Sequence, residues 1–315
     1  MKLLRNYGMM LAAALTIVMT SCGGGPIEHG TEYVLECPKD ANPVDVVSVL
    51  QIMQERLNKF GIDGDYEISS DSNRITLRVR KGVVTDDQKL RQLLLSRANL
   101  TFRSTYSIGE IAPTFDTIQK TFIRVNHFDS VTALTAGLYG YIAGSSQDYS
   151  SPVIAFFRPA DTMAVMKILY HDSILPLLPS DVVFHWGKGQ RMENGEETVA
   201  LFACRVGRNY VMTGNNIESA TSQMNDMSSA YEISLVFNGY GATEFARITK
   251  ANMGRSVAIE VDDFVYSYPT VVAEITGGKA QISGNFSEQE AEDLANILNA
   301  GSYPVPVSLV EMTDF

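Results

Sequence analysis

The cysteine at position 22 is the residue whose type and surroundings most clearly predict a chemical modification. It ends the stretch Met19-Thr20-Ser21-Cys22 and precedes three glycines. Upstream lie Lys2, Arg5 and an apolar run over residues 9–19, which is shorter than the roughly 20 residues of a membrane-spanning helix. This arrangement is typical of a signal peptide with a lipobox, in which the cysteine thiol is diacylated. We expect residues 1–21 to be removed and Cys22 to be the lipidated N-terminus; an ordinary secretory signal with an incidental cysteine is the alternative.

The other groups that could do chemistry are scattered along the chain. No two histidines stand at the spacing of metal ligands, so each is interpreted as a structural or surface residue. The pair Asp262-Asp263 is interpreted as an exposed turn rather than a cation site. The pair Gly277-Gly278 is interpreted as a hairpin rather than a phosphate cradle, because no helix follows it directly. We therefore expect no catalytic residue, no metal and no cofactor. The histidines are His29, His127, His171 and His185.

The composition limits the partners of the chain. Its 315 residues carry a net charge of −11 at pH 7, and 45% of them are hydrophobic. Two domains with their own cores are possible at this length. The negative charge disfavours nucleic acid and anionic lipid, so membrane attachment would depend on the acyl chains of Cys22. Cys37 and Cys204 are interpreted as buried thiols in separate domains; a disulfide between them is the alternative in an oxidising compartment.

The elements that would position these groups are clearest near the N-terminus. Residues 31–37 predict a strand, and Asn42-Pro43 opens a helix whose apolar residues recur every three or four positions until Gly61. Residues 66–80 alternate as a hairpin, residues 85–98 predict a second helix, and residues 100–102 begin another strand. The order strand, helix, strand, strand, helix, strand is the split βαβ plan of ferredoxin-like folds.

The patterns of the remaining chain are uneven. Residues 107–230 are weakly patterned, with strands expected at 153–157, 182–186 and 198–206. The last third is clearer and predicts helices at 242–252 and 287–301. Strands are expected at 233–237, 257–261, 264–267, 271–276, 280–283 and 305–311.

The stretch from Asn252 to Val310 carries a resemblance to a known family. It contains Asn252, Gly254 and Arg255 at the end of a helix, then Val265-Tyr266-Ser267 with Pro269, and then Ile275 to Gly278. Gly284 with Phe286 and a helix with Ala291, Leu294, Ala295, Leu298, Ala300 and Gly301 follow in the same order as in the SecD proteins. The sequence resembles the first periplasmic domain of the SecD/SecDF translocation family over residues 30–106 and 210–312.

The resemblance implies an α+β architecture with a ferredoxin-like base and an inserted α+β head. We expect residues 22–30 to form a tether, residues 31–106 plus 303–312 the base, and residues 107–302 the head. The last strand, residues 305–311, would return to the sheet of the base. In the SecD family, transmembrane helices with ionisable residues couple proton flow to movement. This sequence ends at Phe315, after the final base strand, so the resemblance implies contact with substrate or partners rather than proton-driven work.

The family resemblance also implies a function. We expect a non-catalytic lipoprotein on the periplasmic side of the cell envelope that binds unfolded exported polypeptides or Sec translocon components. A structural or interaction lipoprotein with an unrelated partner is the alternative. Residues 271–276 are a candidate edge strand for pairing with a polypeptide, and methionines suit a surface that binds varied apolar segments, although they also fill gaps in cores. The candidate polypeptide-binding residues are Val271, Val272, Ile275, Met224 and Met227.

Overall fold

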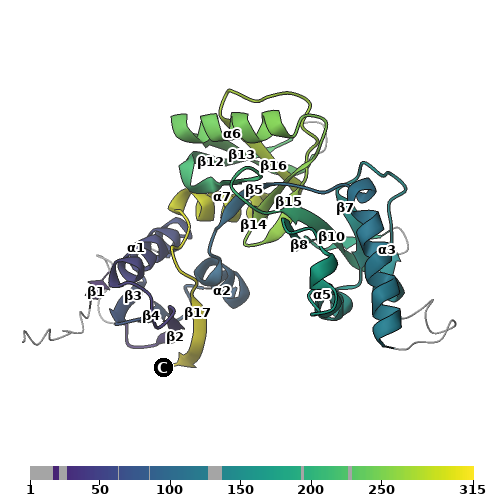
Figure 1. The fold of residues 1–315 in the computed structure, drawn as a ribbon. Coiled ribbons are helices and arrows are strands. Elements are labelled where there is room, and N and C mark those ends of the chain that lie inside the picture. The colour runs from purple at the N-terminus through teal and green to yellow at the C-terminus, as the bar shows by residue number, and fades with distance from the viewer. Residues whose placement is uncertain are drawn as a thin grey trace, which may run out of the picture. The chain divides into compact units, whose positions relative to one another are not determined.

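The computed structural model describes residues 17–20, 27–62, 64–84, 86–126, 137–192, 195–225 and 229–315. Two compact units make up the chain: unit 1 comprises Met1–Arg97 and Ala300–Phe315, and unit 2 comprises Ala98–Asn299 (Figure 1). Both contain helices and strands, so the fold is α+β as predicted. Within the described ranges, no helix is long and apolar enough to cross a membrane. The predicted lipidation site, Cys22, lies outside the described residues.

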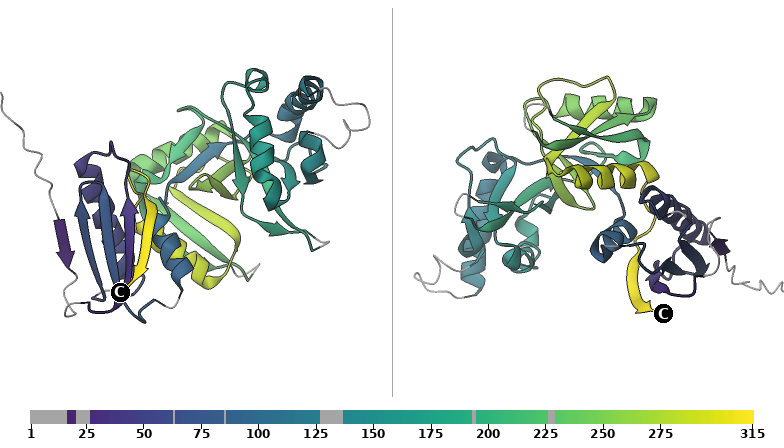
Figure 2. Two further views of the ribbon diagram at one scale, coloured as in Figure 1. Left: turned by 90° about the horizontal axis from the view of Figure 1, so that it is seen from below. Right: turned by 180° about the vertical axis from the view of Figure 1, so that it is seen from behind.

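Unit 1 is built on an antiparallel sheet with strand order β1-β3-β4-β2-β17. The strand β17 pairs with β2 over its whole length, from Ser308 opposite Glu36 to Asp314 opposite Thr31, and Figure 2 shows the two strands side by side. This confirms the predicted return of the last strand to the N-terminal sheet. The elements are β1 (Ile17–Thr20), β2 (Gly30–Glu36), α1 (Pro43–Lys59), β3 (Tyr66–Asp71), β4 (Arg74–Arg80), α2 (Asp87–Leu95) and β17 (Ser308–Asp314).

The local sequence explains these elements. The side chain of Asn42 accepts a hydrogen bond from the Val44 N–H, and Pro43 occupies the first turn of α1, where its missing N–H costs nothing. The apolar residues of α1 then line one buried face. In β4, buried and more exposed residues alternate, as expected for a strand with one face on the core. The buried apolar residues of α1 are Val46, Val49, Leu50, Met53 and Leu57.

One element of the predicted base belongs elsewhere. The strand β5 (Leu100–Ser104) pairs with β14 and β11 in the sheet of unit 2. The predicted boundary at residue 106 is therefore wrong, because the N-terminal segment of unit 1 ends at Arg97. The elements β2, α1, β3, β4 and α2 follow the predicted order, but the fourth strand of that plan is β17. The short apolar pattern of residues 100–102 identifies a strand without identifying its partner.

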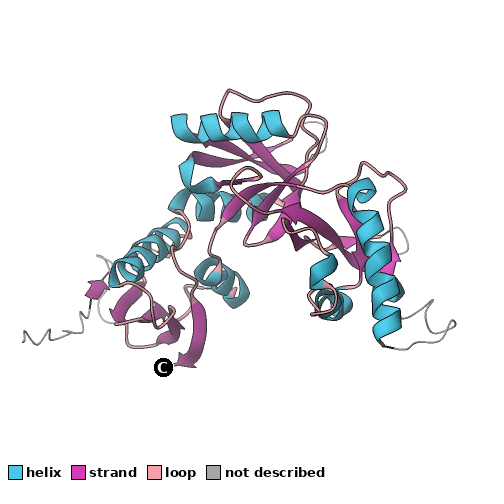
Figure 3. Ribbon diagram, in the orientation of Figure 1, coloured by secondary structure: helices cyan, strands magenta, loops and turns pink. Residues whose placement is uncertain are grey.

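Unit 2 contains a nine-stranded sheet and a three-stranded sheet (Figure 3). The order in the first is β11-β5-β14-β15-β8-β10-β7-β6, with β9 also paired to β10; the second has the order β12-β13-β16. The strands are β5 (Leu100–Ser104), β6 (Ile142–Gly144), β7 (Val153–Phe157), β8 (Val182–Gly187), β9 (Gln190–Arg191), β10 (Glu197–Arg205), β11 (Val211–Thr213), β12 (Ile217–Met224), β13 (Tyr231–Phe237), β14 (Val257–Val261), β15 (Phe264–Ser267) and β16 (Lys279–Phe286).

Two of the hydrophobic cores in the described part of unit 2 are covered by helices. The helices α6 (Gly239–Ala251) and α7 (Glu288–Ala300) share one core with the three-stranded sheet, β5 and β14. The helices α3 (Ile108–Val125) and α5 (Thr162–Leu169) share the other with β7, β8 and β10. Short 3-10 turns lie at Leu138–Tyr141, Pro159–Asp161, Leu175–Leu177 and Gly214–Asn216.

The predicted strand at residues 271–276 is wrong. These residues form a loop in which only Val271 makes an isolated bridge, with Met253, and the side chain of Val271 is buried in the core. Gly277-Gly278 precedes β16 and does not join two strands, so the predicted hairpin there is also wrong. A run of β-branched residues matches the strand pattern, but Pro269 and the burial of Val271 favour an irregular connection.

Candidate functional site

Unit 2 contains a cleft of about 920 Å³ where the strands β8 and β15 part. The two strands run parallel and pair only at Phe264 with Trp186 and at Val265 with Gly187. The N–H of Lys188 still donates to the Val265 carbonyl at 3.1 Å. Beyond this point residues 187–191 and residues 265–269 line the cleft.

The backbone beside the cleft is oriented by the hairpin of β14 and β15. Ile259 lies opposite Ser267, and the Val257 N–H donates to the Pro269 carbonyl at 3.1 Å. Because alternate residues of an antiparallel strand direct their polar groups to opposite sides, the N–H and C=O of Tyr268 point away from β14. Tyr268 therefore presents an unpaired strand edge to the cleft, in the described part of the chain.

Three aromatic residues, Phe202, Tyr266 and Tyr268, line the cleft. The rings of Tyr268 and Phe202 lie 5.1 Å apart between centroids, and Tyr268 is 43% exposed. Tyr266 stacks on Phe286 at 5.8 Å, and burial, followed by the nearby Asp262 and Glu290 carboxylates, raises its pKa. Such rings offer apolar contact area that does not depend on a particular partner sequence.

An ion pair between two of the lining residues borders the cleft. Lys188 Nζ lies 3.3 Å from Glu290 Oε1 and 4.6 Å from the centre of the Phe286 ring. Glu290 belongs to the predicted capping box of α7: its carboxylate accepts from the Ser287 N–H at 2.9 Å. This backbone hydrogen bond, aided by Lys188, holds the pKa of Glu290 below its ordinary value. The cleft thus combines an open strand edge, aromatic walls and a charged rim, an arrangement suited to binding an extended chain.

A buried polar cluster in unit 2 has the residue types of a metal site. His185, Cys204 and Glu260 each place one ligand atom within 4.8 Å of the others. However, Arg103 donates Nε to Glu260 Oε2 at 2.9 Å, and His185 Nδ1 lies 2.9 Å from Glu260 Oε1. A divalent cation here would face the arginine charge in a site closed to water.

The protonation of the cluster agrees with this view. Burial, together with the Glu260 carboxylate, raises the pKa of the Cys204 thiol well above its ordinary value. Burial alone would raise the pKa of Glu260 as well, but His185 and Arg103 outweigh it and hold that pKa below its ordinary value. A protonated thiol is a poor metal ligand. We interpret the cluster as a charge-balanced part of the core.

None of the candidate residues that the structure describes is among the residues that line the cleft. Val271 is 6% exposed, whereas Val272 is 90% exposed, Ile275 39% and Met224 54%. Met227 lies outside the described residues. Tyr268, Phe202 and Lys188 are not among the site residues predicted from the sequence, although the neighbouring Val265-Tyr266-Ser267 is part of the family motif.

The other predicted residues are placed as follows. Cys37 and Cys204 are both buried and free and belong to different units, which confirms their interpretation as separate thiols. His29 and His171 are exposed, whereas His185 is buried in the cluster described above. His127 lies outside the part of the chain that the structure describes. Asp262 and Asp263 form the turn between β14 and β15 with positive φ angles of 51° and 66°.

Comparison with known proteins places this fold in a recognised class. A family model described as "SecDF, P1 head subdomain" matches residues 190–305. The SecD subunit of Rhodothermus marinus is 25% identical over 285 residues, which cover 83% of this chain and 45% of that protein. The SecD subunit of Syntrophobacter fumaroxidans is 42% identical over 101 residues, which cover 32% of this chain and 19% of that protein. Each match covers less than half of the relative's own length.

A solved structure agrees with the sequence matches. The structure titled "Structure and function of a membrane component SecDF that enhances protein export" has a TM-score of 0.52 and 21% identity, and the match covers 89% of this chain and 98% of that one. At this identity the likeness concerns the fold. The chain therefore has the fold of a SecDF periplasmic domain. Together with the matches to SecD subunits, this identifies it as SecD-like and confirms the resemblance to the first periplasmic domain of that family.

Proposed function

We propose that this chain assists protein export by binding extended segments of exported polypeptides in the cleft beside β15, without catalysing a reaction. The observation that carries the proposal is the backbone of Tyr268, which has no pairing partner among the described residues, next to the ring pair of Tyr268 and Phe202. The SecD relatives, described as protein translocase subunits, support a role in export.

The physical basis of binding is the addition of a strand. An extended segment can exchange main-chain hydrogen bonds with Tyr268 whatever its side chains are, while the aromatic walls accept apolar groups. A site that relies on these contacts binds many sequences weakly rather than one sequence tightly. Weak binding suits a protein that must release each segment as export proceeds.

The location of the chain belongs to the same proposal. Lipidation of Cys22 would hold the domain on the periplasmic side of the cell envelope, close to the translocon from which polypeptides emerge. Two acyl chains suffice for stable attachment, since each buried CH₂ group contributes about 0.8 kcal/mol. Translocon components remain partners in this proposal.

The test is a titration of the purified chain against a fluorescently labelled secretory protein in unfolded and folded forms, followed by anisotropy. The unfolded form should bind and the folded form should not. Tyr268→Ala should weaken binding about tenfold by removing one aromatic contact. Tyr240→Ala is the matched control, because Tyr240 is 63% exposed on α6 and does not line the cleft.

A second variant separates backbone pairing from ring contact. Tyr268→Pro removes the ring and also the N–H that faces the cleft, while the pairing with β14 uses Ser267 and Pro269. If the polypeptide binds by strand addition, Tyr268→Pro should bind it more weakly than Tyr268→Ala does. Equal affinity for folded and unfolded forms, or an unchanged affinity of both Tyr268 variants, would overturn the proposal.

The exposed residues predicted from the sequence remain part of the proposal as additional contacts. Val272 is 90% exposed and stands three positions after Pro269, so a segment that leaves the cleft could touch it. Ile275 and Met224 are also exposed. Val272→Asp should weaken binding if this surface takes part; if it has no effect, the binding surface ends at the cleft.

A further inference from the structure

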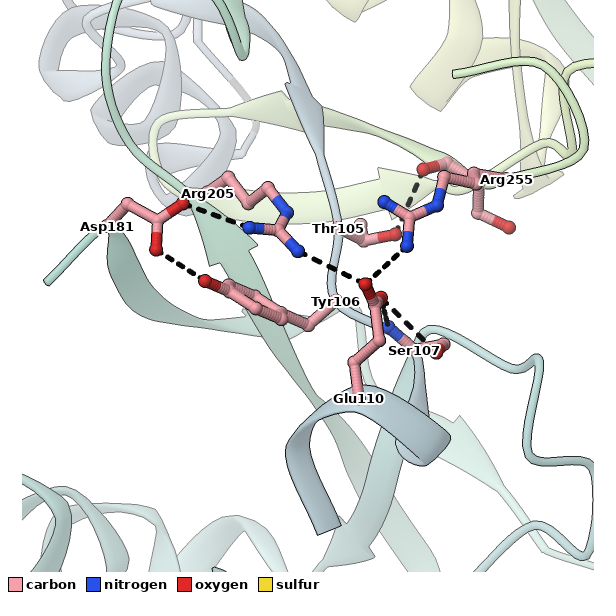
Figure 4. A network of polar contacts seen from close by, with 8 residues as sticks. Thr105, Tyr106, Ser107, Glu110, Asp181, Arg205 and Arg255 are labelled. Atoms are coloured by element: carbon pink, nitrogen blue, oxygen red, sulfur yellow. Dashed lines mark hydrogen bonds and ion pairs between the residues drawn. The ribbon is translucent and has the colours of Figure 1, made fainter. Parts of the chain in front are cut away.

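A network of ionic contacts surrounds the N-terminus of α3 in unit 2 (Figure 4). Glu110 accepts hydrogen bonds from two arginines that approach it from different strands and loops: Nη2 of Arg205 donates at 3.2 Å, and Nη2 of Arg255 donates to the same oxygen. The second oxygen of Glu110 accepts from the Ser107 N–H at 3.0 Å. Both carboxylate oxygens of Glu110 therefore have hydrogen-bond donors, and one of them accepts from both guanidinium groups.

Arg205 is held rigidly. Its guanidinium lies 3.7 Å from the centre of the Tyr106 ring, and Nη1 donates to Asp181 Oδ2 at 3.0 Å. The Tyr106 hydroxyl donates to the other oxygen of Asp181. Both terminal nitrogens of Arg205 thus have partners. Its Nε is buried and has no partner among the described residues, although an arginine in this setting normally uses all of its donors.

A pocket of about 200 Å³ lies beside these arginines. Ser104, which is only 2% exposed, is among the residues that line it, and its hydroxyl is a second donor with no partner among the described residues. A buried donor that lacks an acceptor is costly, and two such donors belong to residues of this one pocket. The residues that line the pocket are Ser104, Arg205, Tyr210, Ala251, Asn252 and Arg255.

The family motif at the end of α6 builds one wall of this pocket. Asn252 donates Nδ2 to the Ile248 carbonyl at 2.8 Å, and its own carbonyl accepts from the Arg255 N–H at 2.9 Å. Gly254 has a φ of 76°, a conformation that favours glycine. The spacing of Asn252, Gly254 and Arg255 thus forms a tight turn that directs Arg255 to Glu110 and the pocket. The polypeptide cleft uses none of these three residues.

We infer that this pocket binds a small oxyanion, a carboxylate or phosphate group, through the Ser104 hydroxyl, Nε of Arg205 and the guanidinium of Arg255. Arginine suits this role because its planar group donates several hydrogen bonds in a fixed fork. Glu110 and Asp181 offset the two arginine charges, so binding should be weak, in the millimolar range for inorganic phosphate, and sensitive to salt. The site is independent of the proposed cleft.

The experiment follows the ¹⁵Nε–Hε resonance of Arg205 in the purified full chain during titration with inorganic phosphate. A parallel titration uses a short peptide with a free C-terminal carboxylate and the same peptide as its amide. We expect the chemical shift of this resonance to change saturably with phosphate, or with the free peptide but not with the amide. Response to phosphate alone identifies a phosphoryl ligand, and response to the free peptide alone identifies a polypeptide carboxylate.

Variants separate this pocket from unspecific ion binding. Ser104→Ala, which removes only the hydroxyl, should weaken binding about tenfold, and Arg255→Gln at least as much. Arg158→Gln, at a surface ion pair with Asp161, is the control and should bind like the parent chain. A chemical-shift change that never saturates would overturn the inference. So would an equal affinity of Ser104→Ala and Arg158→Gln for the titrated anion.

Discussion

The substitution Arg56→Met should destabilise unit 1 specifically. Arg56 is 1% exposed on α1. Its Nη1 donates to the Leu93 carbonyl at 3.1 Å and to the Ser96 carbonyl, and its Nη2 donates to the Gly301 carbonyl at 2.9 Å. The guanidinium also lies 4.0 Å from the centre of the Tyr303 ring. One side chain therefore stabilises the end of α2 and the segment through which the chain re-enters unit 1.

The size of the effect follows from these contacts. Each of the three short hydrogen bonds has a charged donor and contributes about 1.5 kcal/mol, so their loss costs about 4.5 kcal/mol. Methionine retains most of the apolar length and avoids the burial of a charge, which offsets part of this loss. We expect the free energy of unfolding of unit 1 to fall by about 3 kcal/mol.

The two units can be followed separately in urea. Trp186 is the single tryptophan of the chain and lies in β8 of unit 2, so its fluorescence reports that unit. Hydrogen exchange of the amides of β2 and β17 reports unit 1. Arg78→Met is the control, because Arg78 makes a surface ion pair with Glu32 that should contribute less than about 1 kcal/mol. A loss of stability in unit 1 below about 1 kcal/mol would refute the role assigned to Arg56.

Four further predictions concern single side chains. Glu260→Gln should lower the stability of unit 2 by about 3–5 kcal/mol, because Arg103 would lose its buried partner; a urea midpoint of Trp186 fluorescence equal to that of the parent chain would contradict it. Burial would raise the pKa of Glu110, but Ser107 and the two arginines outweigh burial and lower it. The parent chain should therefore be more stable than Glu110→Gln by a constant amount above the ordinary pKa of 4.5, and this difference in stability should disappear on acidification below it. Thermal unfolding at a series of pH values measures the difference, and a difference that grows in acid would contradict the prediction. Because burial raises the pKa of the Cys204 thiol, iodoacetamide should modify it only after denaturation, as mass spectrometry can determine; rapid labelling of the folded chain would show an open site. Cys22→Ala should move the protein from the membrane fraction to the supernatant of cells, and full retention after a high-salt wash would exclude lipidation as the anchor.

The amino-acid sequence by itself determined the local elements and the family. The spacing of Val46, Leu50, Met53 and Leu57 predicted α1 because a helix with one buried face repeats its apolar residues every three or four positions. The motifs after Asn252 carried the resemblance to SecD, and through it the pairing of β17 with β2. Such features follow from periodicity or from an ordered series of motifs, both of which are readable along the chain.

The tertiary structure alone decided which segments meet. The strand at Leu100 could complete either sheet, and it joins unit 2 because β14 and β11 supply its partners there. Val271 and Val272 are neighbours of the same type, yet one is buried and the other is 90% exposed. Strand pairing and burial depend on residues distant in sequence, which a local pattern does not specify. For the same reason, only the fold shows that Tyr268 offers its backbone to a cleft and that Ser104, Arg205 and Arg255 line one pocket.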